Sequence, residues 1–150
     1  MTARCYGFDT VGGVSRAVKA DVLRLPGGVE ARIHVRGSET GNAFTLLTDR
    51  CPPGWMLPPH RHASEAETIH ITAGALWLEV EGRRREMHPG ETVIIPSGTL
   101  HSGGSLGVEP VRRVLVFSPA GMEEFFERLA SMKELAAMVD LAARYGWTFA

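Results

Sequence analysis

The chain has 150 residues, of which 44% are hydrophobic and 22% are charged, and its formal net charge is −1 at pH 7. This length fits one domain with a core that needs no disulfide bonds. The small net charge provides no general attraction to nucleic acids or to anionic membranes, so we expect neither as a partner. No segment has the length and hydrophobicity of a signal peptide or a membrane span, which predicts a cytoplasmic protein.

Short segments rich in β-branched and aromatic residues, separated by glycine or proline, predict β-strands over most of the chain. They lie at residues 31–35, 43–48, 68–72, 75–80, 84–87, 92–95 and 113–117. Many short strands with regularly spaced turns predict an all-β fold with a closed or double-sheet architecture. The two cysteines, Cys5 and Cys51, do not form a close-spaced metal pair and are expected to be reduced thiols.

Two helices are expected, and both lie at the end of the chain. Ser118 is a candidate N-cap for the first helix, with Pro119 as its first helical residue. The second helix is predicted at about residues 133–145. Its apolar stripe comprises Leu135, Met138, Val139 and Ala142. We expect this helix pair to pack on the outside or at the mouth of the β-body.

Three histidines and one glutamate stand at spacings that suit a single metal ion. They are His60, His62, Glu67 and His101. His60 and His62 are two residues apart, so both imidazoles project from the same face if the segment is a strand. The prolines at 52–53 and 58–59 exclude a helix there, because proline lacks the N–H and fixes φ. Glu67 can face back toward the histidines after a short turn, and His101 would come from a strand distant in sequence.

The other three histidines are expected to lie outside this site. His70 is an odd number of residues from Glu67 on one predicted strand, so it points to the opposite face. His34 and His88 are expected at the surface.

The donor set predicts the chemistry of the bound ion. Three neutral imidazoles and one carboxylate around a divalent cation leave a net charge near +1, which favours an anionic oxygen ligand such as an enolate or phenolate. Nitrogen and oxygen donors without a thiolate suit one divalent transition metal ion, which can be Fe, Mn, Ni, Co, Cu or Zn. Glu67 is also the candidate catalytic residue, because it could leave the metal and accept a proton as a general base.

A set of apolar side chains is expected to form a wall for a flat organic substrate. The set comprises Phe44, Leu46, Trp55, Met56, Leu57, Ile69, Ile71, Leu100 and Phe117. Core packing is at least as good an interpretation for the aromatic members, because a small barrel fills its interior with such side chains.

The candidate ligands fall within two spaced blocks. These are Gly54-x5-His60-x-His62-x4-Glu67-x6-Gly74 and Gly90-x5-Pro96-x-Gly98-x2-His101. The blocks resemble the two signature motifs of the cupin superfamily, with Ser105 where the family pattern has an asparagine. The resemblance implies one cupin domain over residues 1–150, with a double-stranded β-helix (jelly-roll barrel) at about 20–118 and C-terminal helices at about 119–145. The short segment between the motifs and the ending from Phe117 to Phe126 look like the small bacterial cupins described as quercetin 2,3-dioxygenase-like.

The resemblance implies a small-molecule substrate and leaves two classes of function open. The first class is an enzyme, for which we favour a metal-dependent dioxygenase that resembles quercetinases. Cupin isomerases and polyketide cyclases are alternatives within this class, and they would use the same metal and base without oxygen. The second is a module that senses or stores a small ligand, but the chain shows no basic helix-turn-helix of the kind attached to regulatory members. A homodimer is also expected, because such cupins pair through N-terminal strands and the edge at residues 31–35 would otherwise be open.

Overall fold

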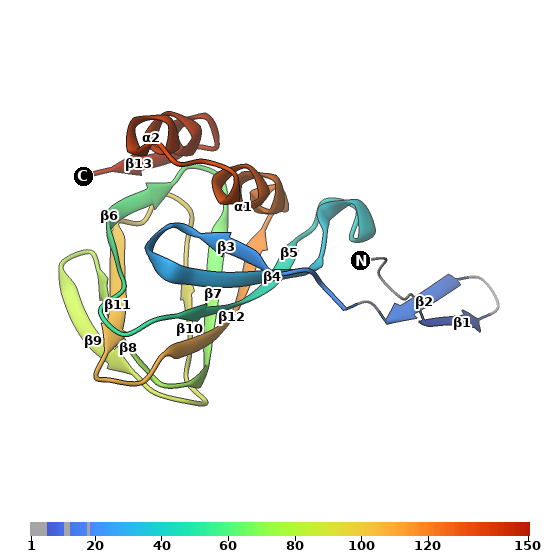
Figure 1. Cartoon of the computed structure of the whole chain (residues 1–150), viewed down its shortest axis with the longest axis horizontal. Helices are drawn as coiled ribbons and strands as arrows, with labels where there is room; N and C mark the ends of the chain where they lie inside the picture. Colours follow the sequence, from blue (N-terminus) through green and yellow to red (C-terminus); the bar gives the residue numbers. More distant parts are fainter. Residues whose placement is uncertain (1–5, 11–12, 18) are drawn as a thin grey trace.

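The computed structural model describes residues 6–10, 13–17 and 19–150, with side chains from residue 19 onward, and consists mainly of antiparallel β-strands (Figure 1). The strands are β1 Tyr6–Thr10, β2 Gly13–Ala17, β3 Leu23–Leu25, β4 Val29–Val35, β5 Thr45–Cys51, β6 Met56–His62, β7 Ala66–Ala73, β8 Ala75–Val80, β9 Arg83–Met87, β10 Thr92–Ile95, β11 His101–Leu106, β12 Val111–Ser118 and β13 Trp147–Phe149. The helices are α1 Met122–Ala130 and α2 Leu135–Arg144, with short 3-10 turns at Pro26–Gly28 and Gly37–Glu39. Neither α1 nor α2 has the length and hydrophobicity of a membrane-spanning helix, and no other helix of the described residues has them.

Two sheets enclose the interior in the double-stranded β-helix that the sequence predicts. The six-stranded sheet has the order β10-β7-β12-β5-β4-β3, and the five-stranded sheet has the order β13-β6-β11-β8-β9. Strands β1 and β2 form a separate hairpin that extends away from the barrel (Figure 1). The edge expected to be open at residues 31–35 is partly covered, because β3 pairs with β4 from Val29 to Ala31.

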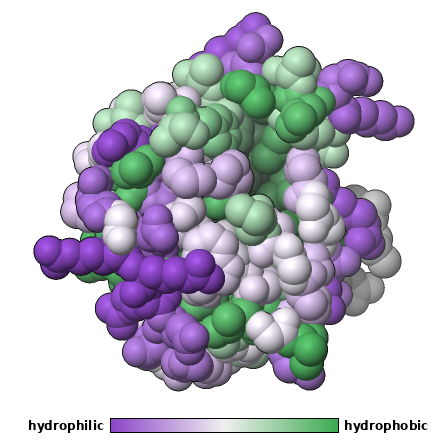
Figure 2. All heavy atoms as spheres, turned by 90° about the vertical axis from the view of Figure 1, so that its left-hand side faces the viewer, coloured by the Kyte–Doolittle hydropathy of each residue, from purple (hydrophilic) through white to green (hydrophobic). Residues whose placement is uncertain are grey.

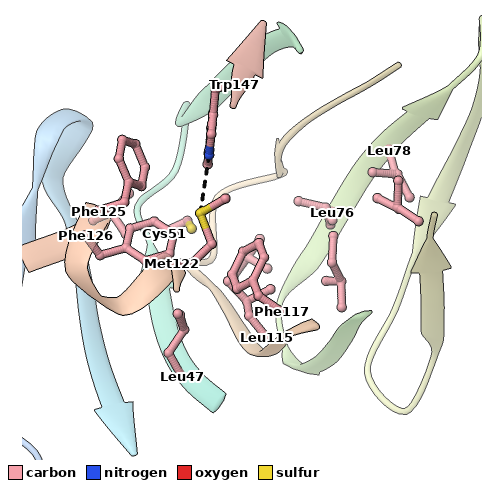
Figure 3. Packing of buried hydrophobic residues seen from close by; sticks show 14 of the residues in the cluster. Leu47, Cys51, Leu76, Leu78, Leu115, Phe117, Met122, Phe125, Phe126 and Trp147 are labelled. Atoms are coloured by element: carbon pink, nitrogen blue, oxygen red, sulfur yellow. Dashed lines mark hydrogen bonds between the residues drawn. The ribbon is translucent and has the colours of Figure 1, made fainter. Parts of the chain in front are cut away.

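The central strands of the six-stranded sheet bury every second side chain, as the two-residue period of a strand requires. On β5 the buried residues are Thr45, Leu47, Asp49 and Cys51; on β7 they are Glu67, Ile69 and Ile71; on β12 they are Val111, Arg113, Leu115 and Phe117. Figure 3 shows how Leu47, Leu115 and Phe117 pack in this interior. The same inward face therefore carries both the hydrophobic core and three charged side chains.

One strand and the first helix begin later in the chain than predicted. The strand expected at 43–48 begins at Thr45, because the preceding segment folds into a turn in which the Asn42 N–H donates to the Gly37 carbonyl at 2.8 Å. The first helix begins at Met122 instead of Pro119. Ser118 does not cap it, since its hydroxyl donates to the Ala43 carbonyl at 2.8 Å.

The C-terminal segment forms a strand that the sequence did not suggest. Strand β13 pairs with β6, with Trp147 opposite His62 and Phe149 opposite His60. The indole N–H of Trp147 also donates to the Sδ atom of Met122 on α1, as Figure 3 shows. The end of the chain thus becomes the neighbour of the strand that carries two candidate ligands.

Candidate metal centre

The fold brings the four predicted ligand residues together in the interior. His60 and His62 lie at the end of β6, Glu67 lies near the start of β7, and His101 begins β11, where it pairs with His60. The candidate ligand atoms of the three histidines all lie within 4.8 Å of one another. The exposed fractions are 2% for His60, 2% for His62, 5% for His101 and 7% for Glu67.

Backbone hydrogen bonds orient two of the imidazoles. The Nδ1 atom of His60 donates to the Pro58 carbonyl at 2.8 Å, and the Nδ1 atom of His101 donates to the Thr99 carbonyl at 2.9 Å. Because Nδ1 of His60 carries the proton, the lone pair of its Nε2 faces the site in the neutral ring. The Nε2 atom of His101 lies 3.2 Å from Glu67 Oε2, to which it donates when protonated; loss of that proton would free its lone pair for a metal ion. Backbone carbonyls in this position are usual partners of metal-binding histidines.

Several buried nitrogens of the cluster have no hydrogen-bond partner among the described residues. They are Nε2 of His60 and both ring nitrogens of His62. Buried polar atoms are nearly always paired, so unpartnered nitrogens that converge on one point call for a ligand. A transition metal ion fits, because imidazole nitrogens together with a carboxylate form a common donor set for such ions.

Burial and charge set the protonation of the four residues. Desolvation lowers the pKa of His60 and of His62 to about 4, so both are neutral at pH 7, as a metal ligand must be. Burial would raise the pKa of Glu67, but its hydrogen bond with His101 and the nearby positive charges outweigh burial and lower that pKa. The same contact, 3.2 Å from Glu67 Oε2 to His101 Nε2, raises the pKa of His101 against the effect of its burial.

Residues outside the predicted ligand set support the centre. The Trp147 ring stacks on His60 with centroids 4.8 Å apart and rings inclined by 10°, and it lies 4.4 Å from the ring of His62. The turn glycine Gly98 adopts a φ of 75°, and its N–H donates to the His62 carbonyl at 2.7 Å. Ser105, which replaces the family asparagine, donates its hydroxyl to the Pro52 carbonyl at 2.8 Å and so ties β11 to the loop before β6.

A cavity of about 520 Å³ opens beside the cluster. Its lining includes the α2 residues Leu135, Met138, Val139 and Ala142, together with Phe125, Phe126 and Trp147. The apolar stripe predicted for the second helix therefore faces the cavity, where Leu135 remains 75% exposed at the rim. In Figure 2, hydrophobic side chains surround a hollow in the upper part of the face. The helix thus lies at the mouth, one of the two expected positions.

The predicted pocket wall coincides only in part with the lining of this cavity. Trp55, Met56, Leu57 and Phe117 line it. Phe44, Leu46, Ile69, Ile71 and Leu100 do not. Leu46 belongs to the face of β5 that points away from the interior, whereas Ile69 and Ile71 are buried farther along β7 in the core. The inward face of β5 carries Thr45 and Leu47, so the parity expected from Phe44 and Leu46 is wrong by one residue.

A buried ion pair, which the sequence interpretation overlooked, also lines the cavity. The Arg113 guanidinium donates from Nε and Nη2 to the two carboxylate oxygens of Asp49, at 3.0 and 2.5 Å, and lies 4.8 Å from the ring centroid of Trp55. The Cys51 thiol points at the same carboxylate, with Sγ 3.7 Å from Oδ2, and burial raises its pKa to about 12. The available signal was strand parity, because Arg113 is two residues from Leu115 and Asp49 is two residues from Leu47, so each shares the inward face of its strand.

The remaining histidines and cysteines lie away from the cluster. His70 is on the outward face of β7, where its Nδ1 lies 2.8 Å from the Thr92 hydroxyl, and His34 and His88 are exposed, as predicted. Cys51 is a free buried thiol, whereas Cys5 lies outside the described residues.

Comparison with known proteins agrees with the motifs. Residues 48–117 match the family model described as "Cupin domain". A quercetin 2,3-dioxygenase of Bacillus subtilis is 26% identical over 110 residues, which cover 73% of this chain and 32% of that protein. The chain therefore matches about a third of the length of this curated relative.

Two solved structures illustrate the likeness of the fold. The structure of KdgF from Halomonas sp. has a TM-score of 0.62 at 21% identity, with 69% of this chain and 90% of that chain covered. The polyketide cyclase RemF from Streptomyces resistomycificus has a TM-score of 0.56 at 27% identity, with 67% and 72% covered. With this double-stranded β-helix and this match to the family model, residues 48–117 are identified as a cupin domain.

Proposed function

We propose that the protein is a mononuclear metal-dependent cupin enzyme that oxidises a small enol- or phenol-type organic molecule with dioxygen. The observation that carries the proposal is the convergence of three buried imidazoles beside Glu67, at one part of an apolar cavity, where His60 and His62 have ring nitrogens without a partner. The likeness to a quercetin 2,3-dioxygenase supports this reaction class.

Each residue of the centre has a distinct part in this proposal. His60, His62, His101 and Glu67 would hold a divalent ion, which would act as a Lewis acid and lower the pKa of a hydroxyl bound to it. Glu67 is ionised at neutral pH, because its pKa is lowered, and would serve as the acceptor of a substrate hydroxyl proton. Trp55, Phe117 and Trp147 present aromatic surface to a flat substrate.

Elemental analysis and oxygen consumption test the proposal together. The purified protein is expected to contain one divalent transition metal ion per chain and to consume oxygen with at least one member of a panel of flavonols and acyclic enediols. Removal of the ion with a chelator should abolish oxygen consumption, and its return should restore it. Full activity of the metal-free protein would contradict the proposal.

A non-oxidative reaction is the second candidate, because the polyketide cyclase RemF is 27% identical over 67% of this chain. In that case Glu67 would move a proton of a bound enol without oxygen, as in a cyclase or an isomerase. Substrate conversion that proceeds equally fast under anaerobic conditions would favour this alternative. A protein that only binds its ligand would saturate with the compound and form no product.

We also propose that the protein forms a homodimer. Strands β1 and β2 pair only with each other among the described strands, and β3 is a short outer strand of the six-stranded sheet. Exposed strand edges are ready partners for another chain. Sedimentation equilibrium should give twice the mass of one chain, and a monomeric mass at micromolar concentration would refute the dimer.

A further inference from the structure

We infer that Arg113 is a second recognition point in the cavity, where its guanidinium donates a hydrogen bond to a neutral oxygen acceptor at the far end of the substrate. The acceptor is a ketone or quinone carbonyl, carried on an apolar body whose other end has the enol or phenol group. The inference rests on the proposed function, because it assigns that other end to the histidine cluster.

The contacts of Arg113 leave one nitrogen free for a ligand. Asp49 accepts hydrogen bonds from Nε and Nη2, and Trp55 covers a face of the guanidinium. No described residue accepts a hydrogen bond from Nη1, and the fully buried unpartnered atoms of these residues do not include it. Since Arg113 lines the cavity, the two N–H groups of Nη1 can reach a molecule inside it. The bidentate pair with Asp49 holds these donors in a defined direction.

Strand pairing gives the separation between Arg113 and the metal centre. In the register of β12 with β7, Phe117 lies opposite Glu67 and Arg113 lies opposite Ile71. Four residues along a strand correspond to about 13 Å between Cα levels, and the long arginine side chain can shorten this to on the order of 10 Å. Leu115 lies between them and lines the same cavity. This spacing suits a flat molecule of two or three fused rings.

Charge decides which kind of acceptor suits Arg113. Asp49 already neutralises the guanidinium within a largely buried pair. A ligand carboxylate at Nη1 would bring a further negative charge close to Asp49 without a counter-charge, and buried charges without a partner are costly. A carbonyl oxygen accepts the same N–H groups and adds no charge.

The rest of the wall limits the substrate further. Among the described residues that line the cavity, the charged or titratable ones are Asp49, His60, Glu67 and Arg113. The others are apolar or aromatic side chains and one glycine, so a polyhydroxylated molecule such as a sugar would leave its hydroxyls without partners. The cavity therefore favours an apolar body with oxygen atoms only at its two ends.

The experiment compares three probes that share a naphthalene diol head with adjacent hydroxyls. The far ring carries an acetyl group, an isopropyl group of similar shape, or a carboxylate. Isothermal titration calorimetry measures the Kd of each probe for the protein with and without Zn²⁺, which suits nitrogen and oxygen donors and has no redox chemistry. The key variant is Arg113→Met/Asp49→Leu, because apolar replacement of a whole buried ion pair is often tolerated. Arg112→Met, at an exposed position of the same strand, is the matched control.

The acetyl probe should bind wild-type protein about tenfold more tightly than the isopropyl probe, because a hydrogen bond to a charged group is worth at least that factor. The carboxylate probe should bind no more tightly than the isopropyl probe. We call the ratio of the two Kd values, isopropyl over acetyl, the acetyl advantage. It should fall to within about twofold in the double variant and remain about tenfold in Arg112→Met. Should the double variant fail to fold in a thermal melt, Arg113→Lys takes its place, since it keeps the charge beside Asp49 and lacks Nη1.

Three results would overturn the inference: no acetyl advantage in wild type, an equal advantage in the double variant or in Arg113→Lys, or tightest binding by the carboxylate probe. The two proposals fail separately. If Zn²⁺ does not tighten any probe while the acetyl advantage remains, the metal centre is wrong and Arg113 is correctly assigned. Absence of binding by all three probes would refute both.

Discussion

The substitution His62→Ala separates the stability contributed by a metal ion from that of the barrel itself. Both ring nitrogens of His62 are buried without a partner, and each unsatisfied buried polar group costs about 1–3 kcal/mol. Truncation to alanine removes this cost but leaves a cavity, for which large-to-small core substitutions lose about 2–5 kcal/mol. Because the two terms oppose each other, the metal-free variant should lie within about 2 kcal/mol of metal-free wild type.

Addition of metal should have very different effects on the two proteins. An ion at 100 times its Kd stabilises the folded state by about 2.7 kcal/mol. For a chain of this size each kcal/mol corresponds to about 2–4 °C in Tm, so the Tm of wild type should rise by roughly 5–10 °C. His62→Ala lacks one of four proposed ligands and should lose most of this rise.

Differential scanning calorimetry of chelator-treated and Zn²⁺-loaded samples measures both effects, and elemental analysis of the same samples gives the metal content. His70→Ala is the control, because His70 lies on the outward face of β7 and contacts only the Thr92 hydroxyl at 2.8 Å in the hydrogen bonds of the described residues. The control should keep the full rise in Tm. An unchanged rise in His62→Ala would refute the assignment of this residue as a ligand.

Three further predictions concern the base, the pH dependence and the end of the chain. Glu67→Gln should keep the metal content within about twofold and lower turnover by roughly 10²–10⁴-fold, the usual contribution of a general base; equal loss of both would leave Glu67 a ligand only. In the metal-free protein burial lowers the pKa of His60 and of His62 to about 4, against an ordinary histidine pKa of 6.5, so the unfolded chain binds more protons between these values. The free energy of unfolding should therefore rise from pH 4 to pH 6.5. The raised pKa of His101 changes stability only above pH 6.5, where the folded protein loses that proton. A urea midpoint that falls between pH 4 and pH 6.5 would contradict this prediction. Deletion of all residues after Ser118 removes α1, α2 and β13 and uncovers the cavity and one edge of β6. Light scattering should therefore detect aggregates. A monodisperse active fragment would disprove the packing role of this segment.

Local patterns were enough to predict the fold class and part of the candidate metal centre. Strands β8 and β10 were predicted with their observed bounds, because alternating or β-branched runs between turn residues depend on neighbouring positions alone. The proximity of His60 and His62 follows from the two-residue period in the same way. Glu67 and His101 required the spacing of the two motifs, and the structure places both beside these histidines.

The sequence by itself thus determined a β-barrel, two amphipathic C-terminal helices and a cluster of metal-binding residue types. Only the tertiary structure decided what surrounds that cluster, because contacts between β12, β5, α2 and β13 join residues far apart in the chain. Arg113 meets Asp49 through the register of β12 with β5, and Trp147 reaches His60 through the pairing of β13 with β6. A short strand such as β13 has little intrinsic signal, since its stability comes from the sheet edge that it covers. The shape and polarity of the cavity, and with them the class of substrate, depend on these long-range pairings.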